Sequence, residues 1–336
     1  MITATMLEIS VRCLNLFGSR HSFSVLNYHR IMPNIDLCSE QALPPELFSE
    51  QLRHLKQYFK VLSLPDAFAL SQRQQLPKNA VVITIDDGFA DCFDYVFPLL
   101  LQHGLTATFF ISTAGLRDGY LWENQISEAI RQAPLSVQNI TLNNELVDLS
   151  TSDARRKAIL YLTELIKYQP VTTRQISISK LLAQTTEPKI INRFVNQEQL
   201  RLMYKAGMTI GAHTVNHPIL TLEQPEHALQ EIAQSKVELE QIIGAPIEFF
   251  AYPNGKYQTD FSDVHINIVR NLGFKAAFST DWGVAETHTG SVFNLKRFTP
   301  WDRDPARFCI RLALNNLVER AHFKIFQHRV RQYVRQ

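Results

Sequence analysis

The segment that most constrains the fold is Val-Val-Ile-Thr-Ile-Asp-Asp-Gly-Phe at residues 81–89. Its β-branched apolar run predicts a short strand buried on both faces, as in the parallel sheets of α/β proteins. Asp86 and Asp87 follow this run directly, and packing does not explain two acids at the tip of a buried strand. Functional residues of parallel α/β folds gather at the carboxyl ends of the strands, so both carboxylates are candidate catalytic residues.

Strand and helix patterns alternate on both sides of this segment. Further strands are predicted at residues 23–28, 61–64, 106–111, 208–212, 248–252, 276–279 and 294–297. The alternation predicts a parallel α/β sheet. No GxGxxG motif follows any of these strands, so a distorted or incomplete (β/α)7-8 barrel is favoured over an open dinucleotide-binding sheet.

Three other segments set the expected domain organisation. Residues 115–196 interrupt the alternation with a mostly helical insertion, of the kind that commonly covers or shapes a site. Residues 1–20 predict a short amphipathic helix before a barrel that spans residues 21–302. Residues 303–336 form one long basic helical pattern, which is either a packing helix or a peripheral contact with an anionic membrane surface.

Composition narrows the class of protein. The net charge of the 336 residues is +2, so no nucleic-acid partner is expected. The four cysteines form no CxxC pair, which argues against a disulfide framework or a cysteine zinc site. No signal peptide and no apolar run long enough for a membrane span is seen, so a cytoplasmic location is predicted, with a peripheral membrane association as the alternative.

Two histidines supply the second candidate cluster. His213 and His217 follow the predicted strand at residues 208–212, in a loop before Pro218. Two imidazoles with a carboxylate suit Zn²⁺ with an open coordination position, although two loop histidines at a helix entry remain the alternative. One carboxylate of the Asp86–Asp87 pair would then bind the metal, and the other would act as general base.

These motifs carry a family resemblance. Residues 84–88 (TIDDG) resemble the TFDDG motif of the polysaccharide deacetylases, the NodB-homology or carbohydrate esterase 4 family. Residues 213–217 (HTVNH) resemble the H-[ST]-x-x-H motif of that family, and residues 249–255 (FFAYPNG) resemble its third motif. The resemblance covers about residues 79–300 and implies hydrolysis of N-acetyl groups from an amino sugar of a polysaccharide or its precursor, with release of acetate.

The resemblance also implies residue roles. Asp86 would be the catalytic base, and Asp87, His213 and His217 would bind one divalent metal, usually Zn²⁺ in this family. Co²⁺ or Ni²⁺ would also fit, because such sites accept several metals. The implied partner is an N-acetylated glycan substrate.

The chain departs from the family pattern at the general acid. The usual acid is a histidine that follows a late leucine, and the nearest late histidine, His288, lacks that context. Residues 26–29 (Leu-Asn-Tyr-His) have the Leu-x-x-His pattern instead, which resembles the circularly permuted exopolysaccharide deacetylase branch. That resemblance implies that His29 is the acid. A strand-end histidine satisfied by the backbone is the alternative.

A second departure concerns the arginine that orients the base. Family members carry it in the third motif, where this chain has Ala251. Arg30 and Arg297, which each follow or end a predicted strand, could replace it, and Arg297 is the candidate carried forward. Asp91 and Asp94 are interpreted as ordinary first-turn acids that complement the dipole of the following helix.

Aromatic residues are the candidates for sugar contact, since their faces pack on pyranose rings. Tyr252, Trp122 and Trp282 are the substrate-binding candidates, with a core position as the alternative for each. A backbone N–H near Tyr252 is expected to stabilise the developing oxyanion. A metal-dependent amidohydrolase for a small non-sugar amide, or a glycan-binding module with a degenerate site, would also fit these residues.

Overall fold

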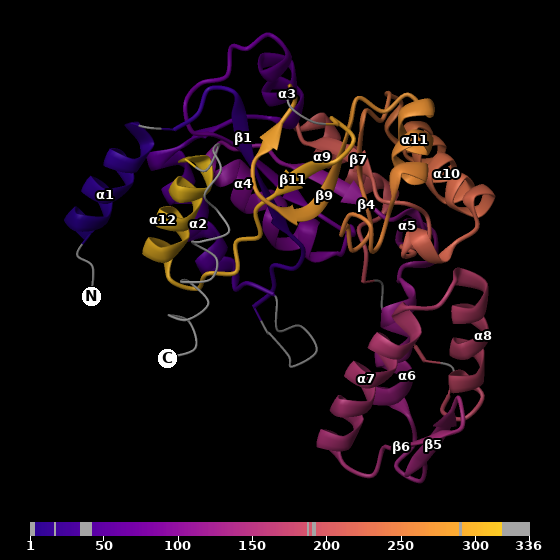
Figure 1. Cartoon of the computed structure of the whole chain (residues 1–336). Helices are drawn as coiled ribbons and strands as arrows, with labels where there is room; N and C mark the ends of the chain where they lie inside the picture. Colours follow the sequence, from indigo (N-terminus) through magenta and orange to yellow (C-terminus); the bar gives the residue numbers. More distant parts are fainter. Residues whose placement is uncertain are drawn as a thin grey trace.

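The computed structural model describes residues 4–16, 18–33, 42–186, 188–189, 193–288 and 291–317. At its centre lies a twisted parallel sheet (Figure 1). Its main strands are β1 (Ser22–Tyr28), β3 (Ala80–Ile85), β4 (Thr108–Ile111), β7 (Thr209–Ala212), β8 (Phe249–Ala251), β9 (Ala276–Trp282) and β11 (Leu295–Arg297). The short strand β2 (Lys60–Val61) pairs with β3, and β10 (Ala285–Glu286) pairs antiparallel with β1.

The sheet closes on itself. Its strands are hydrogen-bonded in the order β1-β3-β4-β7-β8-β9-β11. The Asn27 N–H donates to the Phe298 carbonyl at 2.9 Å, and the Phe298 N–H donates to the Val25 carbonyl at 2.7 Å. These bonds join β1 to the segment after β11, so the predicted distorted (β/α) barrel is confirmed, with the N-terminal strand as its closing member.

Helices surround the barrel. They are α2 (Pro45–Tyr58), α4 (Phe97–His103) with the preceding π-helical turn η1 (Cys92–Val96), α9 (Gln197–Lys205), α10 (Pro225–Ile243), α11 (Asp263–Asn271) and α12 (Pro305–Leu317), with a short 3₁₀ turn η2 (Leu220–Leu222). Helix α3 (Leu64–Gln72) packs through Leu64 and Ala67 against the residues where β1 and β3 begin, Phe23 and Ala80. It therefore lies at the barrel end opposite to the carboxyl ends of the strands.

Alternation along each strand decides which side chains enter the barrel. On β8, Phe249 and Ala251 join the inner apolar cluster, whereas Phe250 and the following Tyr252 join the larger cluster shared with the helices. By the same alternation, the side chain of Asp86, which directly follows β3, lies on the inner side of that strand. The side chains of adjacent residues at the end of a strand thus point to opposite sides of the sheet, one into the barrel and one towards the helices.

The insertion forms a lobe beside the barrel (Figure 1). It follows β4 as α5 (Thr113–Asp118), α6 (Trp122–Gln132), the hairpin β5 (Asn139–Leu142) and β6 (Glu145–Asp148), α7 (Ser152–Lys167) and α8 (Val171–Leu182). Its apolar side chains form a separate cluster that reaches the barrel through Phe89, Phe194 and Val215. The lobe therefore has a core of its own and is anchored beside the Asp86–Asp87 segment.

The chain that returns from the insertion holds this segment directly. The Val195 N–H donates to the Gly88 carbonyl at 3.1 Å, and the rings of Phe89 and Phe194 lie 4.7 Å apart. The Ala90 N–H donates to the carbonyl of residue 193 at 2.7 Å. The turn after β3 is thus fixed by a segment more than one hundred residues later in the chain.

The terminal helices pack on each other and on the barrel. Helix α1 (Ala4–Leu16) lies beside α12 (Figure 1). Helix α12 buries Phe308, Cys309 and Leu312. The predicted basic helix at residues 303–336 is thus represented by α12 as a packing helix, and residues 318–336 lie outside the described residues. Within the described ranges, no helix has both the length and the apolar character needed to cross a bilayer.

Candidate active site

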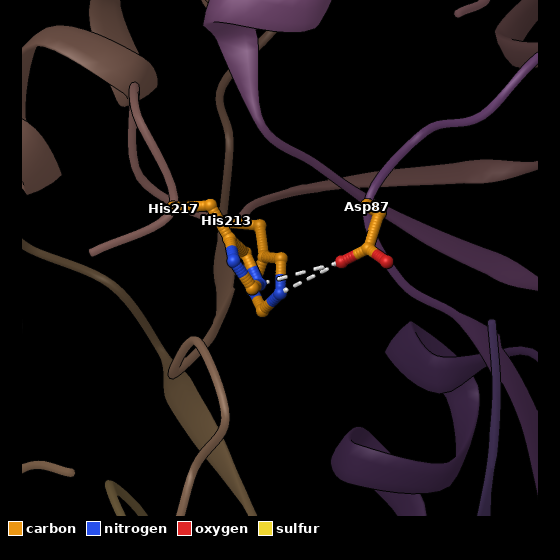
Figure 2. Close-up of side chains that lie close together, drawn as sticks. All are labelled: Asp87, His213 and His217. Atoms are coloured by element: carbon orange, nitrogen blue, oxygen red, sulfur yellow. Dashed lines mark ion pairs between the residues drawn. The ribbon is translucent and has the colours of Figure 1, made fainter. Parts of the chain in front are cut away.

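Three side chains from two strand ends converge on one point. Asp87 follows β3, and His213 and His217 lie in the loop that follows β7; all three face one another in Figure 2. The Asp87 Oδ1 atom lies 3.4 Å from the Nε2 atom of His213 and 3.4 Å from the Nε2 atom of His217. The structure therefore brings together the three residues that the sequence predicts as metal ligands.

The geometry and the donor set suit a divalent cation. Among the described residues, the buried Asp87 Oδ1 atom has no hydrogen-bond partner. Ligand atoms bound to tetrahedral Zn²⁺ at about 2.1 Å stand about 3.4 Å from one another, which is the separation found between Asp87 and each imidazole. An oxygen without a proton donor, facing two imidazole nitrogens at this spacing, fits a metal ion.

The pKa values of His217 and Asp87 also favour metal binding. Burial lowers the pKa of His217 to about 3, so its imidazole is neutral at pH 7. Burial alone would raise the pKa of Asp87, but the two histidines outweigh it and hold that pKa well below the usual range. The pKa of His213 is raised, because Asp87 and Asp86 outweigh the lowering effect of burial. A metal ion binding here would meet Asp87 and His217 already deprotonated, and the neutral form of His213 would supply the third ligand.

The first histidine has a defined tautomer. The buried His213 Nδ1 atom lies 2.7 Å from the carbonyl oxygen of Ala251 on β8, to which it donates. That bond leaves Nε2 without a proton and directed towards Asp87, as a metal ligand requires. Ala251, which stands where the family motif has an arginine, thus contributes its backbone to the site.

The histidine loop is held by a residue that the sequence did not single out. The buried carboxylate of Glu231, on α10, accepts hydrogen bonds from the N–H groups of Val215 and Asn216 and from the Asn216 side chain. The loop needs this support, since Thr214 and His217 have positive φ angles of 63° and 52°. Such backbone costs on the order of 1–3 kcal/mol and persists only where surrounding contacts impose it.

The turn after β3 is also strained. Asp87 has a φ angle of 75° and Gly88 has one of 93°. A Cβ atom at residue 88 would lie 3.0 Å from the Ile111 side chain, so the position requires glycine for both space and conformation. The turn sends the Asp87 carboxylate to the histidines while Asp86 stays on the strand.

Asp86 is bound by an arginine from the opposite end of the sequence. The Arg297 Nη1 and Nη2 atoms donate to the two carboxylate oxygens of Asp86, each at 2.8 Å, and both residues are at most 1% exposed. The Arg297 Nε atom donates to the carbonyl of Ser279 at 2.9 Å. This bidentate geometry orients the carboxylate and is the strongest form of ion pairing available to it.

Burial alone would raise the pKa of Asp86, but Arg297, with help from His213, lowers it below the ordinary value. The group is therefore ionised at neutral pH. His29, which directly follows β1, places its Nε2 atom 3.9 Å from the Asp86 Oδ2 atom and is partly exposed. A carboxylate that can accept a proton and an imidazole that can donate one thus stand side by side.

Arg30, the other candidate for the arginine that orients Asp86, pairs with Asp91 instead. Its Nε atom donates to Asp91 Oδ1 at 3.0 Å, and its guanidinium lies 4.0 Å from the centre of the Phe89 ring. Asp91 is buried and also accepts from the Ile31 N–H at 2.6 Å. The interpretation of Asp91 as an ordinary helix-dipole acid is therefore wrong, because this carboxylate ties the β1 end to the β3 turn.

His288, the late histidine compared with the family's usual general acid, lies far from this cluster. The His288 Nε2 atom lies 2.6 Å from the carbonyl of Ser71, on α3 at the opposite end of the barrel.

Tyr252 lies in the core, contrary to its prediction as a substrate-binding residue. Its ring is buried, stacks on Phe261 at 3.7 Å, and donates its hydroxyl to the Phe293 carbonyl at 3.0 Å. Its backbone N–H donates to the Phe278 carbonyl at 3.1 Å. Neither group is available to a sugar or an oxyanion, because the strand alternation turns this side chain towards the helix layer.

The two tryptophan candidates have different surroundings. Trp122 is buried beneath the guanidinium of Arg174, 4.7 Å from its ring, and borders a cavity of about 420 Å³ between the insertion and the histidine loop. Trp282 is half-buried at the carboxyl end of β9, and its ring lies 5.2 Å from that of Trp301, which is 61% exposed. Trp282 and Trp301 therefore offer the more accessible aromatic surface.

Glu123, at the start of α6, is a further acid near the Asp87, His213 and His217 cluster. Its Oε1 atom lies 3.8 Å from His217 Nδ1. Burial raises the pKa of Glu123 to about 7, and the charge of Asp87 adds to the rise. No local sequence pattern indicated that Glu123 would lie beside the Asp87, His213 and His217 cluster.

Comparison with known proteins decides the family. The family model for polysaccharide deacetylase matches residues 73–169 and 172–277, more than half of the chain. The chain belongs to the polysaccharide deacetylase family. The family assignment made from the Asp-Asp-Gly and His-x-x-x-His motifs is thereby confirmed.

Solved structures share the fold of this polysaccharide deacetylase family member. The Streptococcus pyogenes deacetylase PplD, solved in complex with acetate, is 20% identical, with a TM-score of 0.56 over 83% of this chain and 92% of that one. IcaB from Ammonifex degensii is 18% identical, with a TM-score of 0.56 over 87% and 97%. A de-N-acetylase from Aggregatibacter actinomycetemcomitans is 17% identical, with a TM-score of 0.54 over 82% and 94%.

Proposed function

We propose that this chain hydrolyses N-acetyl groups of an amino sugar in a polysaccharide or its precursor, using one divalent cation. The observation that carries the proposal is the ionised Asp86 clamped by Arg297 beside the Asp87, His213 and His217 cluster. Membership of a deacetylase family supports the reaction class. Two solved structures with the same fold, a de-N-acetylase and a deacetylase in complex with acetate, agree with it.

Asp87, His213 and His217 would hold the cation, which would be Zn²⁺ or, with the same ligands, Co²⁺ or Ni²⁺. When bound, it would supply Lewis acidity to the acetyl carbonyl and to water. Asp86 is placed to accept the proton of the attacking water, since Arg297 keeps it ionised and fixes both of its oxygens.

His29 is the proposed general acid. An amide nitrogen leaves poorly as an anion, so the amino sugar must be protonated as the C–N bond breaks. His29 stands next to Asp86 on the accessible side of the pair, 3.9 Å away, and no other described histidine outside the metal cluster lies there. Trp282, together with exposed Trp301, is the proposed surface for the sugar ring.

The first test is release of acetate. The purified protein is expected to release acetate from N-acetylglucosamine oligomers, to lose this activity after dialysis against a chelator, and to regain it with added Zn²⁺, Co²⁺ or Ni²⁺. A protein that binds the oligomers but releases no acetate at any metal loading would be a glycan-binding module. Equal rates before and after verified metal removal would contradict the metal-dependent reaction.

His29→Ala is expected to reduce kcat for the oligomers by about a hundredfold without changing zinc content, because the leaving nitrogen loses its proton donor. An aryl acetate ester, whose leaving group needs no proton, should be affected much less. His21→Ala, an exposed histidine just before the same strand, is the matched control and should behave as wild type. Equal losses on the amide and the ester would show that His29 is not the acid.

A further inference from the structure

The two histidines of the metal cluster are supported by different parts of the chain. His213 donates from Nδ1 to the Ala251 carbonyl, which belongs to the barrel. His217 also turns Nε2 to Asp87, but its buried Nδ1 atom has no hydrogen-bond partner within the part of the chain that the structure describes. Metal-bound histidines almost always donate their second N–H to a carboxylate or a carbonyl, so His217 lacks a partner of the usual kind.

The insertion places a carboxylate at that position. Glu123 Oε1 lies 3.8 Å from His217 Nδ1, and the other oxygen, Oε2, is buried and has no partner among the described residues. The gap is longer than a hydrogen bond of about 2.7–3.2 Å. It is also too short to hold a bridging water, so a small side-chain rotation would join the two groups directly. A buried imidazole nitrogen without a partner therefore faces a carboxylate that has one buried oxygen without a partner.

The insertion also holds the backbone of this histidine. Arg174, on α8, donates from Nη2 to the Asn216 carbonyl at 2.6 Å and from Nη1 towards the His217 carbonyl at 3.4 Å. Its guanidinium packs over the ring of Trp122, the residue before Glu123. Since His217 has a positive φ angle, contacts on its carbonyl help to keep a conformation that the loop alone would not favour.

We propose that Glu123 is the positioning residue of His217 and accepts its Nδ1–H hydrogen bond when the metal is bound. The bond fixes the ring so that Nε2 faces the cation, and it increases the basicity of the ligand. The lobe formed by α5 to α8 is then part of the metal centre rather than only a cover. Docking of the lobe and binding of the metal stabilise each other.

Metal affinity tests this role. Zn²⁺ affinity is measured by competition with a chromogenic chelator, and the visible spectrum of the Co²⁺-loaded protein reports the ligand geometry. Glu123→Leu, which fills the same volume without an acceptor, should bind Zn²⁺ about 10- to 100-fold more weakly and alter the Co²⁺ spectrum. Glu123→Gln, whose amide oxygen can still accept the hydrogen bond, should restore most of the affinity.

Glu128→Gln is the control on the same helix. Glu128 pairs with Arg193 and contacts no metal ligand, so this variant should lower the melting temperature of the metal-free protein and leave Zn²⁺ affinity unchanged. Wild-type Zn²⁺ affinity in Glu123→Leu, or the same weakening in Glu128→Gln, would overturn the proposal. A loss beyond about 1,000-fold in Glu123→Leu, larger than outer partners cause, would make Glu123 a direct ligand and overturn it too.

The inference rests on the metal site of the proposed function, but its readout does not depend on turnover. A protein that binds Zn²⁺ with the expected dependence on Glu123 and releases no acetate would defeat the proposed reaction and leave this role in place. If the protein releases acetate and Glu123→Leu retains full Zn²⁺ affinity, the proposed reaction stands and the role of Glu123 is wrong.

Discussion

Arg297→Met is expected to destabilise the protein by about 3–5 kcal/mol at neutral pH, because it leaves the Asp86 charge buried without its partner. The arginine and the carboxylate are at most 1% exposed and share two hydrogen bonds of 2.8 Å. Urea unfolding at pH 7 measures the loss in the free energy of unfolding.

The pH dependence of this variant has a definite sign. In the wild type, Arg297 lowers the pKa of Asp86, so the pair stabilises the fold above the ordinary carboxylate pKa, and this contribution disappears as the pH falls through the lowered pKa. Without Arg297, burial dominates and raises the pKa. The acid limb of kcat/KM should therefore move to higher pH, because Asp86, the proposed base, must be ionised to act.

Lys296→Met, one residue earlier on β11, is the matched control. Lys296 is exposed, whereas Leu295 and Arg297 on either side of it are buried. The control should unfold at nearly the wild-type urea concentration and keep the wild-type pH profile. An unchanged acid limb in Arg297→Met would show that this arginine does not set the ionisation of the base.

Asp86→Asn is expected to lower kcat for acetate release by about 10²- to 10⁴-fold, which is the usual contribution of a general base. The amide is close in shape to the carboxylate but cannot take a proton from water. The three proposed metal ligands are unchanged, so zinc content should remain at the wild-type level. Initial rates of acetate release and metal analysis on the same sample measure both quantities.

Asp94→Asn, at an exposed aspartate in the helical turn that follows, provides the control and should retain full activity. The substitution of Asp86 also leaves Arg297 facing a neutral group, so the stability of both variants has to be measured beside their rates. Full turnover in a folded, zinc-loaded Asp86→Asn protein would remove Asp86 from the mechanism and the proposed reaction with it.

Much of the fold follows from local sequence. The β-branched run at residues 81–85 makes a strand because its side chains suit a sheet that is covered on both sides. Gly104 ends α4 in the left-handed conformation, with a φ angle of 64°, which glycine adopts without a steric penalty. Asn196 and Gln199, three residues apart, form a capping box at the start of α9. These features depend on neighbours within a few residues, so the sequence alone is sufficient to predict them.

The convergence of Asp87 with His213 and His217 was predictable for a different reason. Parallel strands of one barrel deliver their carboxyl ends to the same face, so a motif after β3 and a motif after β7 must meet there. The prediction for Tyr252 failed because alternation on β8 turns its ring to the helices, and the exact strand end was needed to see this.

By itself, the sequence determined the family, the barrel class and the two motifs that form the candidate metal centre. Only the tertiary structure decided that Arg297 rather than Arg30 binds Asp86, since this depends on which strands close the barrel and on their register. It also decided that Glu123 of the insertion faces His217. Asp86 and Arg297 are 211 positions apart, and Glu123 and His217 are 94 positions apart. Such contacts depend on how the barrel closes and how the insertion packs beside it, so no local sequence pattern encodes them.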